Sequence, residues 1–225
     1  LLLLAHRKRE NNNIGVAGVA SNVRIMGIRT VPNSSDELDV DVVEAFIYAA
    51  KNGARIINCS FGKARNEGGM IVSEAIDFIG KNYGTLVVAA AGNDSRNIDN
   101  RATYPATFQN ETLLVVASTS SRGGMSYFSN YGIKNVDVAA PGSAIYSTVP
   151  GNKYSSMSGT SMASPNTAGL AAEVLAHFPE LSPIELKKVL MNSVTKVSRF
   201  SNKVMSGGRI DLEKALDLAL TNSQK

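Results

Sequence analysis

Short apolar runs alternate with amphipathic stretches along most of the chain, and the two kinds of segment predict different elements. Apolar runs rich in β-branched residues predict buried strands over residues 23–26, 55–60, 85–91 and 112–118. Apolar residues at helical spacing predict helices over residues 39–52, 70–82, 161–178, 182–194 and 211–220. Strands that are apolar throughout are typical of parallel sheets buried on both faces. We therefore predict the α/β class, with a mostly parallel sheet and helices on both of its faces.

The remaining segments are expected to be loops and turns. Residues 94–107 are polar and predict a long loop, and residues 136–156 predict short strands and turns broken at two Pro-Gly pairs. No internal repeat or low-complexity linker divides the chain. Residues 1–225 are therefore expected to form one domain or part of one.

The chain begins with four leucines and no methionine. A signal peptide carries its basic residues before the apolar region, whereas here Arg7, Lys8 and Arg9 follow it. We therefore expect the first residues to belong to a buried helix rather than to a signal peptide.

Composition narrows the function further. The 225 residues are 44% hydrophobic and 19% charged, which is typical of a globular protein. The net charge of +4 comes without a stripe of basic and aromatic residues, which argues against a nucleic-acid partner. No apolar run reaches the roughly 18–20 residues of a membrane span, so no membrane partner is expected. Cys59 is the single cysteine, so the chain forms no internal disulfide.

Ser161 is the first candidate for chemistry. It lies in the segment GTSMASP, residues 159–165, where small residues surround a serine at the start of the longest predicted helix. Unpaired N–H groups and the positive end of the helix dipole favour developing negative charge there, which suits an acyl-transfer nucleophile. The alternative is that Ser161 is an ordinary helix N-cap.

Asn93 is the second candidate. It follows the strand predicted over residues 85–91, at the edge of a parallel sheet where ligands usually bind. An amide at this place can donate a hydrogen bond to an oxyanion. The alternative is an Asx turn formed with Asp94 and Ser95.

Several segments resemble, in order and spacing, the subtilisin-like serine proteases, or subtilases. They are residues 12–20, 58–62, 90–93, 136–142, 159–165 and 207–211. Together the resemblances extend over essentially the whole chain. They imply a three-layer subtilisin-like fold whose N-terminal part is missing, so that residues 1–225 are the C-terminal larger part of a single peptidase domain.

The resemblance also implies roles for individual residues. Ser161 would be the nucleophile, and Asn93 would be the side-chain donor of the oxyanion hole beside the backbone N–H of Ser161. One wall of the substrate site would be Ser60, Phe61 and Gly62, and the facing wall would be Ala90, Ala91 and Gly92. A peptide would bind between them as an added strand. Tyr104-Pro105 resembles a dipeptide at the rim of this site whose proline bond is often cis.

The resemblance leaves the catalytic triad incomplete. In subtilases the Asp and the His come before the nucleophile, and both belong upstream of residues 12–20. Of the two histidines present, His6 lies in a basic polar stretch and His177 lies near the end of a predicted helix. Neither fits the role of the base. We expect the His and Asp to come from a missing N-terminal segment or from another chain that carries it.

A calcium site is also implied. In the family, the loop that resembles residues 10–16 often binds Ca²⁺, which takes six to eight oxygen ligands. Here the ligands would be the Asn12 side chain and the carbonyls of Glu10, Ile14 and Val16. The alternative is a polar turn with no ion, and no cofactor is required for the chemistry itself.

An acidic cluster, Asp36, Glu37, Asp39 and Asp41, precedes the first predicted helix. The resemblance to subtilases implies that this cluster borders the S2–S4 substrate subsites, where it could favour basic residues in a substrate. The alternative is that it caps the helix and faces solvent.

Two functions remain open. The first is a serine endopeptidase that hydrolyses polypeptides through an acyl-enzyme on Ser161. The second is an inactive pseudoprotease, or a fragment, that binds peptides without cutting them. The family is mostly secreted, so we expect a secreted or cell-envelope protein.

Overall fold

The structure is a computed structural model that describes residues 15–224. The leucine-rich start, His6 and the ligand candidates Glu10, Asn12 and Ile14 therefore lie outside the described residues.

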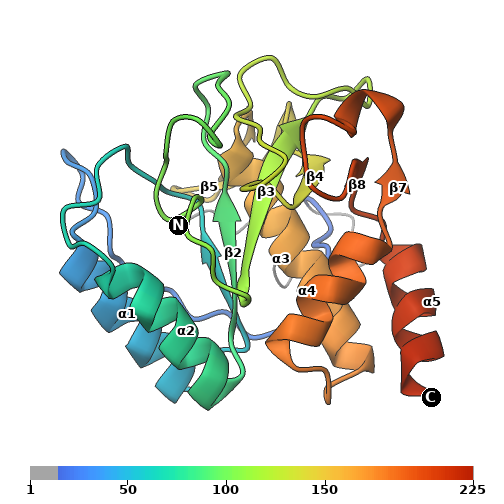
Figure 1. Ribbon diagram of the computed structural model, residues 1–225, viewed down its shortest axis with the longest axis horizontal. Helices are drawn as coiled ribbons and strands as arrows, with labels where there is room; N and C mark the ends of the chain where they lie inside the picture. Colours follow the sequence, from blue (N-terminus) through green and yellow to red (C-terminus); the bar gives the residue numbers. More distant parts are fainter. Residues whose placement is uncertain (1–14, 225) are drawn as a thin grey trace.

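The framework is a sheet with helices on both faces (Figure 1). Its strands are β1 (Ile56–Cys59), β2 (Leu86–Ala90), β3 (Leu113–Thr119), β4 (Val138–Pro141), β7 (Thr195–Lys196) and β8 (Gly208–Arg209). They are ordered β1-β2-β3-β4-β8-β7, and only the pairing of β7 with β8 is antiparallel. The predicted parallel sheet is confirmed.

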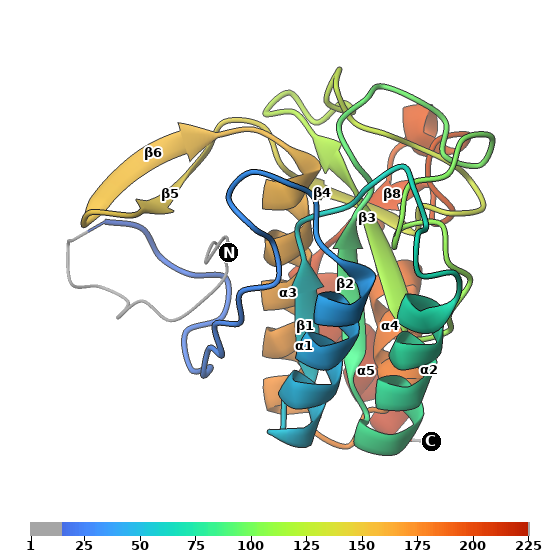
Figure 2. The same ribbon diagram turned by 90° about the vertical axis from the view of Figure 1, so that its left-hand side faces the viewer.

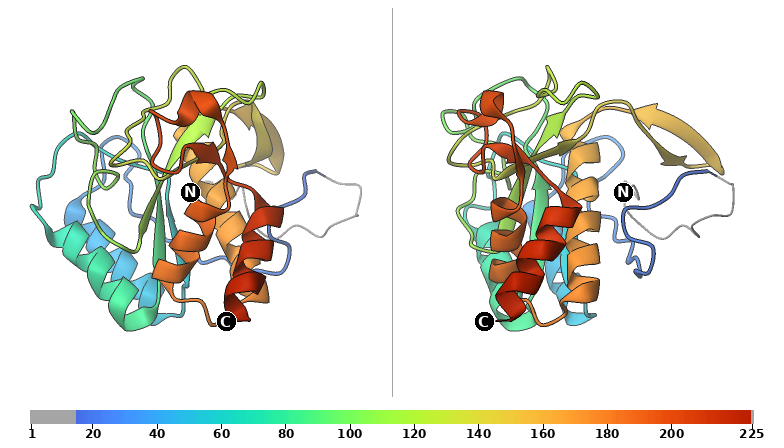
Figure 3. Two further views of the ribbon diagram at one scale, coloured as in Figure 1. Left: turned by 45° about the vertical axis from the view of Figure 1, so that its right-hand side comes forward. Right: turned by 90° about the vertical axis from the view of Figure 1, so that its right-hand side faces the viewer.

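The helices form two outer layers. One layer contains α1 (Asp39–Lys51) and α2 (Ile71–Tyr83), and the other contains α3 (Thr160–His177), α4 (Pro183–Asn192) and α5 (Leu212–Ser223). The two cores alternate along β2, because Val87 and Ala89 pack with the first layer while Leu86 and Val88 pack with the second. Burial on both faces explains why β2 is apolar throughout. In the second layer, α5 lies beside α4 (Figure 3).

Two smaller elements complete the fold. The antiparallel hairpin of β5 (Ile145–Val149) and β6 (Lys153–Met157) projects away from the main sheet (Figure 2). The short 3₁₀ helix Ser198–Phe200 connects β7 to β8. No helix among residues 15–224 is long and apolar enough to cross a membrane.

The strand predicted over residues 23–26 is wrong. The segment is irregular, and the side chains of Ile25 and Met26 are each 39% exposed. A strand needs a neighbouring backbone with which to exchange hydrogen bonds. Within the described residues no strand lies beside this segment, and β1 stands at the edge of its sheet.

Candidate active site

Ser161 is the second residue of α3, at the carboxyl edge of the parallel strands. The helix follows Gly159, whose backbone is extended, with φ 162° and ψ 161°. The Ser161 hydroxyl is half-buried and donates a hydrogen bond to the carbonyl oxygen of Ser60, at 3.2 Å. The first N–H groups of an α-helix have no partner within the helix, so the backbone here favours an anion beside Ser161.

A network of side chains ties the first turn of α3 to the end of β1. The Ser60 hydroxyl donates to the Ser161 carbonyl oxygen (3.0 Å) and accepts a hydrogen bond from Asn58 Nδ2 (2.9 Å). Asn58 Oδ1 in turn accepts from the Ser164 hydroxyl, at 2.7 Å. The two segments that sequence analysis treated separately are therefore held together by hydrogen bonds across the site.

Asn93 lies beside Ser161, in the loop after β2. Its Oδ1 accepts hydrogen bonds from the backbone N–H of Thr160 at 2.8 Å and from the Thr160 hydroxyl at 3.0 Å. Because a backbone N–H can only donate, the atom of the Asn93 amide that faces it must be the oxygen. The Nδ2 group then donates to no described residue. Asn93 Nδ2 and the backbone nitrogen of Ser161 both lie 3.6 Å from the position that a Cβ atom would take at Gly159.

Asn130 is a residue of this site that sequence analysis missed. It is fully buried, and its Oδ1 accepts from the backbone N–H groups of Asp94 (3.0 Å) and Arg96 (3.1 Å). Its Nδ2 donates to the Ala91 carbonyl oxygen at 2.9 Å. One side chain thus holds the loop that carries Asn93 from both ends. A lone asparagine in the run SNYG offers no signal of this in the sequence.

Thr103 lies close to one glycine of each predicted wall, Gly62 and Gly92. After Ser60–Gly62, Lys63 forms a short antiparallel bridge with Tyr104, with N–H···O distances of 2.8 and 3.0 Å. Tyr104-Pro105 is cis, as the resemblance implies. On the other side, Ala90 and Ala91 are buried, and Gly92 is half-buried with φ +99°, a conformation that favours glycine.

A base for Ser161 is not found among residues 15–224. The one histidine of this range, His177, is exposed at the far end of α3, about 24 Å along the helix from Ser161. Its Nδ1 lies 3.0 Å from the Glu173 carbonyl oxygen. Cys59 is not a competing nucleophile, because it is fully buried and burial raises the pKa of its thiol.

Two residues of the acidic cluster, Glu37 and Asp39, contact the buried side chain of Lys63. Lys63 is buried, and its ammonium group forms ion pairs with Asp39 at 2.9 Å and Glu67 at 3.2 Å. It also donates to the Glu37 carbonyl oxygen at 2.9 Å. Burial lowers the pKa of Lys63, but the two carboxylates reverse this and raise it overall. The Asp39 carboxylate is therefore already paired with a cation of the same chain.

The calcium prediction remains open. Val16 is described and lies in an irregular segment, whereas the other three predicted ligands lie outside the described residues. Among residues 15–224, no group of three or more His, Cys, Asp or Glu side chains is placed to hold a metal ion.

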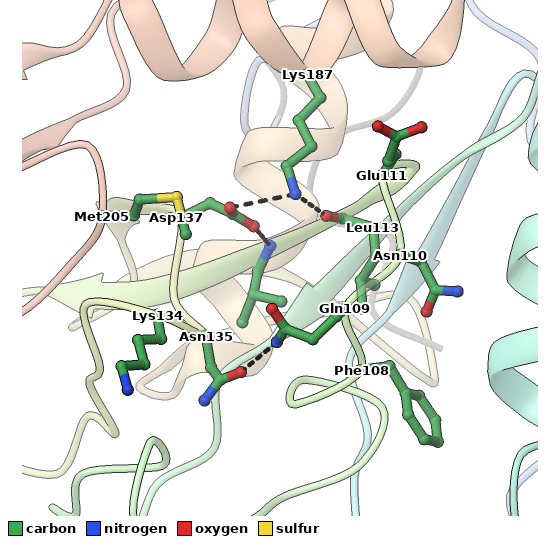
Figure 4. A pocket seen from close by; sticks show the side chains of 11 residues that line it. Phe108, Gln109, Asn110, Glu111, Leu113, Lys134, Asn135, Asp137, Lys187 and Met205 are labelled. Carbon is green, nitrogen blue, oxygen red and sulfur yellow. Dashed lines mark hydrogen bonds and ion pairs between the residues drawn. The ribbon is translucent and has the colours of Figure 1, made fainter.

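A cavity of about 200 Å³ lies away from Ser161 (Figure 4). Leu113 at the start of β3 and Asp137 just before β4 line it, so it lies at the amino ends of the strands. Lys187 of α4 reaches into it and pairs with Asp137 at 3.2 Å. The Asp137 carboxylate also accepts from the Val115 N–H, at 2.7 Å.

Comparison with known proteins agrees with this geometry. Residues 8–208 match the family Peptidase_S8, described as the subtilase family. Thermitase from Thermoactinomyces vulgaris is 38% identical over 206 residues, which cover 92% of this chain and 70% of thermitase. A thermophilic serine proteinase of Bacillus sp. (strain AK1) is 38% identical over 84% of this chain, but the match spans only 44% of that protein.

A solved structure from Pseudoalteromonas arctica PAMC 21717, described as proteases, superimposes with a TM-score of 0.81 at 32% identity. The matched region covers 93% of this chain and 67% of the Pseudoalteromonas chain. The Bacillus relative is named as a serine proteinase, and the family match over residues 8–208 includes both the Ser161 segment and the Asn93 loop. The chain therefore belongs to the subtilase family.

Proposed function

We propose that this chain is the nucleophile-bearing part of a serine endopeptidase of the subtilisin type. The observation that carries the proposal is the joint placement of Ser161 and Asn93. Thr160 fixes the Asn93 amide through its Oδ1, and the remaining Nδ2 and the Ser161 nitrogen lie equally far, at 3.6 Å, from the Cβ position of Gly159. This placement argues against the two alternatives. If Ser161 were only a helix N-cap, no side-chain donor would be needed near it, and if Asn93 only formed an Asx turn, its oxygen would accept a hydrogen bond within its own loop rather than from Thr160.

In the proposed reaction, the Ser161 Oγ attacks the scissile carbonyl carbon while its proton passes to a base. The carbonyl oxygen becomes an oxyanion, which Asn93 Nδ2 and the Ser161 N–H stabilise. The C–N bond then breaks, the amine leaves with a proton, and water hydrolyses the acyl-enzyme. Ser60–Gly62 and Ala90–Gly92 hold the peptide from either side.

The base and its orienting carboxylate are proposed to be a His and an Asp outside this chain's described residues, either upstream or on another chain. The position of β1 supports this, because β1 stands at the edge of the described sheet with three of its four residues only partly buried, and an edge strand leaves a row of N–H and C=O groups for a further segment to pair with. We also propose a secreted or cell-envelope location, a calcium ion at residues 10–16 and a polypeptide substrate.

Labelling with a fluorophosphonate tests the proposal. With the part proposed to carry the His and Asp present, we expect a covalent adduct on Ser161, found by intact mass and by mapping the modified peptide, and no adduct in Ser161→Ala. An adduct would show that a base reaches Ser161. A folded chain that binds peptides but gives no adduct, even with the upstream segment present, would contradict the peptidase and support a pseudoprotease.

Asn93→Ala should slow this labelling; because it also leaves the buried Thr160 N–H and hydroxyl without their acceptor, urea unfolding is measured beside it to confirm that the variant is folded. In subtilisin itself, removing the side-chain oxyanion donor lowers turnover by about 10²–10³, and a loss of that order is expected here. Asn82→Ala, an exposed asparagine at the end of α2, is the control. Equal labelling rates for the two variants would remove Asn93 from the proposed oxyanion hole.

A further inference from the structure

Positive charge is concentrated in two stretches of the chain that contain no acidic residue. Residues 112–136 and 186–210 carry eight of the 23 basic residues and none of the 19 acidic residues. The rest of the chain has 15 basic and 19 acidic residues, so outside these stretches the chain is slightly acidic. The net charge of +4 therefore originates in the two stretches.

The fold places parts of the two stretches side by side, in the loops after β3 and β7. The Gly132 N–H donates to the Lys203 carbonyl oxygen at 2.8 Å, and the Met205 N–H donates to the Val136 carbonyl oxygen at 2.7 Å. Figure 1 shows both loops at the top of the view, beyond the carboxyl ends of β3 and β4. The two stretches therefore share one surface of the molecule.

Three cations lie in these loops and define what we call the basic surface: Arg122, Arg199 and Lys203. Arg199 Nη1 is 3.5 Å from the position that a Cβ atom would take at Gly124, two residues after Arg122. Lys203 Nζ is 3.6 Å from the centroid of the Tyr131 ring, which attracts a cation. Arg122 and Arg199 are exposed, and Lys203 is half-buried. Within residues 15–224 none of the three forms an ion pair with a carboxylate.

The basic surface adjoins the turn that precedes the nucleophile. The Ser126 hydroxyl, in the loop after β3, lies 2.6 Å from the Ser143 hydroxyl. Ser143 follows Gly142, whose carbonyl oxygen accepts the N–H of Gly159 at 2.8 Å. A polypeptide held at the candidate active site can therefore reach the basic surface with residues that lie outside the two walls.

An exposed aromatic side chain accompanies the cations. Tyr127, in the loop after β3, is 91% exposed and packs edge-on against Phe128, with ring centroids 5.3 Å apart. Tyr and Arg are enriched at protein interfaces, where a tyrosine supplies a large apolar contact and a polar tip. This composition fits a polypeptide partner better than a charge-only contact does.

We propose that the basic surface is a secondary binding site for an acidic segment of a polypeptide substrate. This inference rests on the proposed function, because it names a class of substrate for the same protein. Carboxylates of such a segment would pair with cations that have no partner in the described chain, so no existing ion pair has to break. Exposed pairs of this kind add selectivity and a faster encounter, and salt weakens them.

Peptide binding tests the inference without requiring turnover. The experiment uses the 225-residue chain with Ser161→Ala and two capped peptides, (Glu-Gly)₄ and its neutral counterpart (Gln-Gly)₄. Affinities are measured by NMR titration at low salt. The acidic peptide should bind about 10-fold more tightly, with shifts in the loops after β3 and β7. This advantage should be lost at about 0.5 M salt, which screens exposed charges.

Two variants remove charge from the basic surface. The first combines Arg122→Gln, Arg199→Gln and Lys203→Gln and should lower the affinity for the acidic peptide by about 10-fold, to that of the neutral peptide. The second is Arg122→Glu alone, at an exposed position, and should lower this affinity by about 5-fold even if the triple variant is unstable.

A matched control removes the same number of charges from exposed side chains elsewhere, by combining Arg24→Gln, Lys51→Gln and Lys81→Gln. It should retain the affinity for the acidic peptide. An equal loss in this control would show that net charge alone attracts the peptide and would overturn the inference. Equal affinities for the two peptides would overturn it as well, and so would tighter binding of octathymidylate or of phosphatidylserine vesicles.

Hydrolysis separates this inference from the proposed function. With the part proposed to carry the His and Asp present, an acidic tail on a peptide substrate should lower KM and leave kcat unchanged, and the triple variant of the basic surface should cancel the gain. Selective binding without hydrolysis would contradict only the proposed peptidase. Hydrolysis with the same KM for tailed and untailed substrates would overturn only the secondary site.

Discussion

At the scale of single residues, the site depends on polar side chains that hydrogen bonds hold in fixed positions. Thr160 orients the Asn93 amide, and Asn130 holds the loop on which Asn93 stands. Such residues do not touch a substrate, yet they decide where the donor groups lie. Their removal should therefore affect stability and reactivity together.

Asn130→Ala should lower the free energy of unfolding and slow Ser161 labelling. It leaves the Asp94 N–H, the Arg96 N–H and the Ala91 carbonyl oxygen without their partner, at about 1–3 kcal/mol for each group that stays buried. Urea unfolding and the labelling rate give the two readouts. Asn82→Ala should change neither measurement, and a stable Asn130→Ala that labels normally would contradict the assigned role.

At the scale of elements, the start of α3 is pressed against the turn after β4. The Gly159 N–H donates to the Gly142 carbonyl oxygen at 2.8 Å. A Cβ atom at Gly142 would lie 2.4 Å from the Ser118 hydroxyl oxygen and 2.7 Å from the Gly159 carbonyl oxygen. The absence of a side chain at Gly142 therefore allows the nucleophile turn to pack on the sheet.

Gly142→Ala should destabilise the fold by about 1–3 kcal/mol, as overpacking does, and should slow Ser161 labelling because the Gly159 turn must move. Gly124→Ala is the matched control, since the nearest atom to its Cβ position, Arg199 Nη1, is 3.5 Å away. Thermal unfolding and labelling compare the two variants. Equal behaviour of both would show that the turn tolerates the extra atom.

The start of α4 carries a capping box, in which two residues satisfy each other's free N–H groups. The Glu185 N–H donates to the Ser182 hydroxyl at 3.3 Å, and the Glu185 carboxylate accepts from the Ser182 N–H at 2.9 Å and from its hydroxyl at 2.7 Å. Hydrogen bonds from the Ser182 hydroxyl and then from its N–H hold the pKa of Glu185 below its ordinary value.

Ser182→Ala should cost about 1 kcal/mol of unfolding free energy at neutral pH. Because the pKa of Glu185 is lower in the folded state, the ionised carboxylate stabilises the fold above its unfolded pKa, and this contribution is lost as pH falls through the folded pKa. The cost of the substitution should therefore shrink on acidification. Urea titrations at pH 7 and pH 3, with exposed Ser223→Ala as control, check this; a cost independent of pH would contradict it.

At the scale of the whole molecule, one ion pair links the helical layer to the middle of the sheet. Lys187 of α4 donates to the Leu113 carbonyl oxygen at the start of β3 and pairs with Asp137 beside β4 (Figure 4). The side chain of Asp137 is only 6% exposed. Its burial raises the pKa of the carboxyl group, although Lys187 and the Val115 N–H oppose this.

Lys187→Met should destabilise the protein by about 3–5 kcal/mol at neutral pH, because it leaves a buried carboxylate without its cation. A raised pKa in the folded state means that the ionised form opposes folding once the pH exceeds the unfolded pKa. The destabilisation should therefore be smaller at pH 4 than at pH 7. Unfolding curves at both pH values measure it, and Lys188→Met, on the exposed neighbour, is the control.

Much of the architecture follows from local pattern. The apolar run that became β2 and the helical spacing of α1, α2 and α3 predict those elements to within a residue or two, because burial on one face or on both leaves its period in the sequence. The segment GTSMASP likewise indicates a serine at a helix start, because small residues are needed where a helix meets a sheet closely.

The tertiary structure alone decided the rest. Residues 23–26 have the composition of a strand but no neighbour with which to pair, and pairing is a property of two segments. Asn130 and Lys63 owe their roles to partners far away in the chain. Sequence determined which residues could do chemistry, and the fold determined which of them meet, because hydrogen bonds and excluded volume act only between atoms that folding brings together.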